Sequence, residues 1–118
     1  MIRILSDLLY GYALLDNKVV NGLNISECGL ILLLENPNSS YRWRYNLSDN
    51  NIINFQSKIE LFINKENICG RRRLLLFVFK PLSEGICTIS FKKYKSWENH
   101  SYFIEESTYF IVVNKVRN

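Results

Sequence analysis

The chain consists of apolar runs of five to ten residues separated by polar clusters. The runs are rich in Ile, Val, Leu, Phe and Tyr, residue types that are common in β-strands. The clearest run is Tyr41–Leu47, in which three aromatic residues alternate with two arginines and an asparagine. Alternation at a period near two predicts half-buried strands, and helical periodicity is weak throughout.

The pattern predicts six clear strands, followed here in chain order: Gly29–Glu35, Tyr41–Leu47, Ile52–Ile63, Leu74–Lys80, Ile86–Tyr94 and Thr108–Val116. The opening stretch Ile4–Leu15 fits either a short helix or an irregular strand. About seven short strands within roughly 100 residues is the count of an immunoglobulin-like sandwich. We therefore predict an all-β fold, an immunoglobulin-like β-sandwich of about seven strands.

Polar clusters between these strands predict the loops. Residues 35–40 form the strongest turn signal, because Pro37 fixes its φ angle and the Asn and Ser around it hydrogen-bond to nearby backbone. Further loops are predicted at Asn64–Arg73, Pro81–Gly85 and Lys95–Ser101.

Size and composition fit one folded domain over residues 1–118. The 118 residues are 47% hydrophobic and 14% aromatic, enough to bury a core without a metal or disulfides. Residues 1–20 carry the weakest pattern and could be the start of a piece of a longer precursor. The longest apolar runs, Leu30–Leu34 and Leu74–Phe79, are far shorter than the roughly 20 residues of a membrane span, so we expect no membrane partner.

The three cysteines, Cys28, Cys69 and Cys87, do not form a disulfide framework, because their number is odd. Their spacing fits no zinc pattern, and the chain has a single histidine. We read them as buried thiols and expect no metal or cofactor. Unpaired thiols fit a cytoplasmic or vesicular interior, and secretion after processing of a precursor also remains open.

Catalytic chemistry is missing from the pattern. His100 stands in a polar loop, and nothing links it to a cysteine nucleophile. Glu105 and Glu106 are adjacent, so on a strand they would point to opposite faces. Glycines are scattered singly rather than gathered in a phosphate-binding loop. We therefore expect a binding protein and not an enzyme.

The triplet Arg71–Arg73 is the one concentrated charge in a chain of net charge +4. It could bind phosphates, which keeps a basic nucleic-acid-binding β-domain as one alternative. Nucleic-acid readers usually add a wider basic face, so we expect no nucleic-acid partner.

The three polar loops resemble those of the chagasin family, inhibitors of papain-like cysteine proteases. The segment 36–43, with the sequence NPNSSYRW, resembles the family's NPTTGY/F-x-W motif. Residues 69–73 fall where the family has a glycine-rich loop, and Lys95-Ser96-Trp97 falls where it has Arg-Pro-Trp. The resemblance covers about Asn24–Val116.

This chain departs from the family motifs at several positions. Ser40 replaces the glycine of the first motif, which restricts the backbone. The second loop keeps only Gly70, with arginines around it, and no proline precedes Trp97.

The resemblance implies a sandwich in which three loops at one end form a wedge. The central loop would enter the protease cleft, the other two would flank it, and a monomer would inhibit reversibly and without a covalent bond in a 1:1 complex. The target could be an endogenous or a host protease. The predicted protease-binding residues are Asn36, Pro37, Asn38, Ser39, Ser40, Tyr41, Gly70, Arg71, Arg72, Arg73, Lys95 and Trp97.

Two of the aromatic residues have a clear structural interpretation. We expect Trp43 to belong to the core and Tyr41 to support its loop. A generic immunoglobulin-like interaction or adhesion domain, which would not depend on residues 36–41, remains the main alternative.

Overall fold

A computed structural model describes residues 11–63, 72–95 and 103–115. Within these residues the chain forms eight strands. They are β1 (Tyr12–Leu14), β2 (Val20–Asn24), β3 (Cys28–Glu35), β4 (Tyr41–Leu47), β5 (Ile53–Ile63), β6 (Arg72–Pro81), β7 (Gly85–Lys95) and β8 (Glu105–Asn114).

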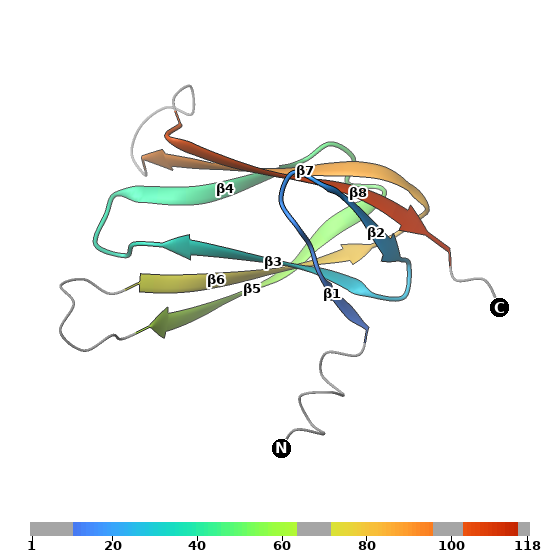
Figure 1. Cartoon of the computed structure of the whole chain (residues 1–118), viewed down its shortest axis with the longest axis horizontal. Helices are drawn as coiled ribbons and strands as arrows, with labels where there is room; N and C mark the ends of the chain where they lie inside the picture. The colour runs from blue at the N-terminus through green and yellow to red at the C-terminus, as the bar shows by residue number, and fades with distance from the viewer. Residues whose placement is uncertain (1–10, 64–71, 96–102, 116–118) are drawn as a thin grey trace, which may run out of the picture.

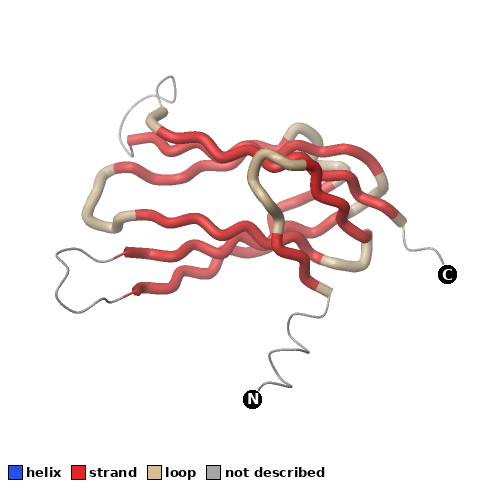
Figure 2. The backbone as a smooth tube through the Cα atoms, in the orientation of Figure 1, coloured by secondary structure: helices blue, strands red, loops and turns tan. Residues whose placement is uncertain are grey.

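The strands form two four-stranded sheets that face each other as a sandwich (Figure 1). Their orders are β1-β3-β6-β5 and β2-β8-β7-β4. The central pairs are antiparallel, whereas the edge strands β1 and β2 each pair in parallel with their neighbours. Figure 2 shows only strands and loops in the described part of the chain, which contains no helix able to cross a membrane. The predicted all-β sandwich is confirmed, with eight strands instead of about seven.

The core lies between the sheets and takes alternate residues from each strand, as the period-two pattern requires. The largest side chains with almost no exposed surface are Phe79, Phe91, Leu23, Ile31, Ile53, Leu75, Ile89, Ile111 and Cys87. Aromatic rings pack edge to face across the two sheets, with the Phe77 and Phe91 ring centroids 4.8 Å apart. Such burial is worth roughly 1.5–3 kcal/mol for each large apolar side chain, which makes the sandwich a stiff support for its loops.

The first part of the chain follows the strand alternative of the prediction where it is described, and it adds a second strand, β2, that was not predicted. Residues 12–14 of the Ile4–Leu15 segment form a short strand, and residues 4–10 lie outside the described residues. The sequence pattern missed β2 because a polar residue, Asn21, occupies one of its buried positions. The Asn21 amide group bonds to the backbone of Asp16, Val19 and Phe110, which satisfies it without solvent.

Several strand boundaries also differ from the prediction, among them those of β8, which spans Glu105–Asn114 instead of Thr108–Val116. β6 begins at Arg72, so Arg72 and Arg73 belong to a strand and not to the predicted loop. They stay in register with β5, where Arg72 pairs with Ile63, because the backbone ladder continues although the side chains are charged. β5 is irregular between Phe55 and Ser57, which explains the mixed alternation of its sequence.

The described cysteines agree with the thiol interpretation in part. Cys87 is buried, Cys28 is half-buried, and both are free thiols. Burial raises the pKa of the Cys28 thiol, and nearby Lys80 partly opposes that shift. Cys69 lies outside the described residues.

Candidate functional site

The strand ends that flank three chain connections lie at the same end of the sandwich (Figure 1). One connection is the described segment 36–40 between β3 and β4, and the other two join β5 to β6 and β7 to β8. The register agrees, because Glu35 pairs with Arg73, Ile63 with Arg72, and Tyr41 with Lys95. We call this region, made of residues 36–40 and the strand ends at 63, 72 and 95, the loop end.

The described members of the predicted site therefore come together. They are Asn36, Pro37, Asn38, Ser39, Ser40, Tyr41, Arg72, Arg73 and Lys95, all on or beside the loop end. Gly70, Arg71 and Trp97 lie outside the described residues, although the strands that flank them reach this end of the molecule.

The segment 36–40 forms the predicted turn. The backbone N–H of Ser39 donates to the carbonyl of Asn36 at 3.1 Å, and the N–H of Asn38 donates to the Asn36 side chain at 2.9 Å. The N–H of Tyr41 donates to the Ser39 hydroxyl at 3.2 Å. These short-range bonds are the reason that Asn and Ser favour turns.

Arg42 holds this turn from the side of β4. Its guanidinium group donates to the carbonyl oxygens of Ser39 at 2.6 Å, Tyr41 at 2.8 Å and Pro37 at 3.2 Å. Three backbone acceptors spread over the turn are thus gathered on one planar cation, for which the fork of an arginine is well suited.

Glu35 lies beneath the turn as a buried carboxylate, with a side chain only 3% exposed. It forms an ion pair with Arg73, accepts the backbone N–H of Trp43 at 3.1 Å, and lies 3.7 Å from the Arg42 Nε. Arg73 also approaches Glu60 at 3.7 Å. Two arginines and a backbone donor thereby compensate a charge that would be costly to bury alone.

Trp43 is a core residue, as predicted. Its ring is buried, and its indole N–H donates to the carbonyl of Leu34 at 2.9 Å. The Lys93 ammonium lies 4.9 Å from the ring centroid. Tyr41 is half-buried at the foot of the turn, 5.9 Å from the Lys95 ammonium, which fits the predicted supporting role.

The sequence interpretation missed Glu35 and Arg42 as parts of the site. The signal for Glu35 was present, since it follows Ile31 and Leu33 at the inward positions of β3. A charge at a position that should be buried calls for a partner of opposite charge. The role of Arg42 depends on the turn folding back over it, which periodicity does not reveal.

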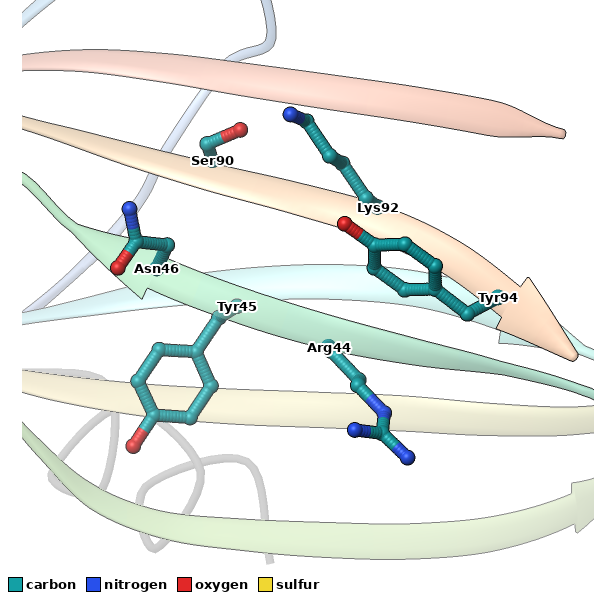
Figure 3. Close-up of a pocket in the computed structure, with 6 residues that line it drawn as sticks. All are labelled: Arg44, Tyr45, Asn46, Ser90, Lys92 and Tyr94. Atoms are coloured by element: carbon teal, nitrogen blue, oxygen red, sulfur yellow. The ribbon is translucent and has the colours of Figure 1, made fainter. Parts of the chain in front are cut away.

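The described residues offer little other site chemistry. They contain no group of three or more His, Cys, Asp or Glu able to hold a metal ion. A hollow of about 380 Å³ lies along β4 and β7. Figure 3 shows the side chains that line it: Arg44, Tyr45, Asn46, Ser90, Lys92 and Tyr94. Its side chains point in different directions instead of converging, so the loop end is the better candidate for function.

Comparison with known proteins gives a family match. Residues 27–113 match the model of a family described as chagasin family peptidase inhibitors. No curated protein matches the chain.

Similar solved structures give the same fold. The cysteine protease inhibitor EhICP2 from Entamoeba histolytica has a TM-score of 0.78 at 18% identity, covering 87% of this chain and 96% of that one. Amebosin has a TM-score of 0.55 at 16% identity, covering 89% and 96%. PbICP-C, solved in complex with falcipain-2, has a TM-score of 0.52 at 18% identity, covering 89% and 98%.

Proposed function

As a member of the chagasin family of peptidase inhibitors, the chain inhibits papain-like cysteine proteases, and we propose that it does so by placing its loop end in the active-site cleft. Inhibition is then reversible and non-covalent, because the inhibitor only occupies the groove. A monomer binds one protease molecule.

The observation that carries this proposal is that hydrogen bonds within the turn at 36–40, together with the Arg42 side chain, hold the turn in one shape. Asn36 and Asn38 are exposed at the turn, whereas Arg42 and Glu35 beneath it are half-buried and buried. A segment that is already fixed in the free protein loses little conformational entropy on binding. This is the property expected of a loop that inserts into a cleft.

The flanking contacts follow from the family resemblance. Gly70, Arg71 and Trp97 contact the protease on either side of the turn, and Arg72 and Lys95 extend that surface. Trp97 is the natural anchor, since tryptophan is enriched among interface residues that dominate affinity. We assign Arg73 to the support of the turn, because its side chain pairs with the buried Glu35.

The test is a titration of the protein against several papain-like proteases, with an unrelated serine protease as the control. We expect inhibition of papain-like enzymes that is lost on dilution, a 1:1 equivalence point, and an unchanged intact mass of the protease. Absence of inhibition at micromolar concentration would contradict the proposal. A variant with residues 36–41 scrambled separates this function from that of an adhesion domain, which would not depend on the turn.

Replacing Trp97 tests the assigned anchor. Trp97→Ala should weaken inhibition by roughly 2 kcal/mol, about 30-fold, as for other buried aromatic anchors. The inhibition constant gives the answer, with circular dichroism to show that the sandwich is intact. An unchanged constant would remove Trp97 from the contact surface.

A further inference from the structure

We propose that Arg42 is a positioning residue that fixes the shape of the inhibitory turn before the protease arrives, with Glu35 as its anchor. This proposal rests on the proposed function, in which the turn at 36–40 enters the cleft. It adds a restraint that acts through the turn and requires no contact between Arg42 and the enzyme.

Arg42 makes half of the hydrogen bonds that hold the turn. Within the turn, one backbone–backbone hydrogen bond, from Ser39 to Asn36, and two side-chain bonds fix the path of the chain. Arg42 adds three more, all to backbone carbonyls, at positions 37, 39 and 41. It therefore doubles the hydrogen bonds that hold the turn and ties Pro37, Ser39 and Tyr41 to one side chain.

The backbone of the turn uses no left-handed conformation. The only non-glycine residue with a positive φ in the described chain is Lys18, so Ser40 has an ordinary backbone conformation. The segment 36–41 contains no glycine. With Ser40 in place of a glycine, the turn is built from residues of ordinary conformation whose carbonyls converge on one side chain. Arg42 thus restrains the path of a turn that contains no glycine, by binding three of its backbone carbonyls.

Glu35 anchors the Arg42 side chain at the base of the turn. Glu35 and Arg42 directly precede and follow the segment 36–41, so their contact closes the turn at its base. Glu35 is itself held by Arg73 and by the backbone N–H of Trp43. The Arg42 side chain is 35% exposed. Without the contact to Glu35 it would have considerable rotational freedom.

The experiment compares Arg42→Met and Arg42→Lys with a matched control, Arg44→Met. Arg44 is an exposed arginine two residues further along β4, so its replacement by Met removes the same charge from the same strand. We expect Arg42→Met to raise the inhibition constant about 10- to 100-fold, mostly through faster dissociation, because the protease must then order the turn. Arg42→Lys should raise the inhibition constant by up to as much as Arg42→Met does, because a lysine ammonium lacks the planar, forked donors of a guanidinium group. Arg44→Met should stay within a few-fold of wild type.

Amide hydrogen exchange in the free inhibitor separates positioning from direct contact. In Arg42→Met the amides of Asn38, Ser39 and Tyr41 should exchange faster, while those of β7 keep their protection. In Glu35→Gln, which keeps an acceptor for the Trp43 N–H, we expect faster exchange at the same turn amides. The double variant should inhibit no more weakly than Arg42→Met, because both changes remove one coupled restraint.

Two outcomes would overturn the role proposed for Arg42, and a third, distinguishable from them, would overturn the proposed function. Unchanged turn exchange in Arg42→Met would overturn the restraint, whatever happens to inhibition. An equal loss of inhibition in Arg42→Met and Arg44→Met would mean that only charge matters, and would also overturn it. A wild-type protein that inhibits no papain-like protease would overturn the proposed function, even if exchange showed that Arg42 holds the turn.

Discussion

At the scale of single residues, the loop end depends on a charge in an apolar position. Ile31 and Leu33 bury their side chains between the sheets, and Glu35 follows them in phase. An isolated carboxylate there would cost several kcal/mol, so its arginines and the Trp43 N–H are conditions for folding as well as for the turn. The core changes from apolar to ionic at the point where the strands give way to the loop end.

Removing this carboxylate should therefore destabilise the protein. Glu35→Ala leaves the largely buried Arg73 without its main partner, and we expect a loss of about 3 kcal/mol in the free energy of unfolding. Urea denaturation measures it. The matched control is Glu60→Ala, because Glu60 approaches Arg73 from an exposed position and should contribute less than about 1 kcal/mol. Equal effects of the two changes would show that burial of Glu35 does not matter.

At the scale of elements, regular alternation made most strands predictable. β3, β4, β6 and β7 were found nearly at their observed bounds, because apolar residues occupy nearly every inward position. β2 was missed because its buried Asn21 breaks that pattern and is compensated by partners distant in sequence, such as Phe110. Arg72 and Arg73 were assigned to a loop because charge is typical of loops, whereas strand pairing carries them into β6.

The same distinction applies to the site. Local turn chemistry identified residues 36–40, since Asn36, Ser39 and their neighbours bond within the turn. The support beneath it was not predictable in this way. Arg42, Glu35 and Arg73 come from three strands. The register of β3 and β6 brings Glu35 to Arg73, and the turn that crosses between the two sheets brings Arg42 to Glu35.

The hairpin between β6 and β7 allows stability to be changed away from the loop end. Gly85 begins β7, whereas β7 reaches the loop end at Lys95. Gly85 has a φ of +149°, and a Cβ added there would lie 2.5 Å from the Ile52 Cδ1. A side chain at this position therefore strains the backbone and clashes with a partly buried neighbour.

Gly85→Ala should lower the free energy of unfolding by about 1–3 kcal/mol. Inhibition measured well below the melting temperature should be unchanged, because the turn at 36–40 is held by contacts at the other end of the strands. The combination of a lower Tm and an unaltered inhibition constant is the expected result. A parallel loss of inhibition would show that the two ends of the sandwich are coupled.

At the scale of the whole molecule, the sandwich separates its two ends. β8 runs from the loop end, where Glu105 pairs with Lys93, to the opposite end, where Asn114 pairs with Asn24 of β2. Figure 1 shows the turn between β3 and β4 and the turn between β2 and β3 at opposite ends of the sandwich. A bulky group should therefore block inhibition at one end and be harmless at the other.

Two natural Asn-x-Ser sequences provide this comparison, because Asn38 lies in the turn and Asn24 lies at the far end, both exposed. Two variants are made in a host that glycosylates proteins. One keeps only the acceptor Asn38 and the other keeps only the acceptor Asn24. In each variant the remaining three acceptor asparagines, Asn46 and Asn99 among them, are changed to Gln. Because the proposed complex places the turn inside the cleft, a glycan on Asn38 should prevent its entry, and that sample should therefore lose inhibition and regain it after enzymatic removal of the sugar. The Asn24-glycosylated variant should inhibit like the same variant without its sugar, so that the Asn38→Gln change is present in both samples. Full activity with the glycan on Asn38, or loss with it on Asn24, would mean that the protease binds another surface of the sandwich.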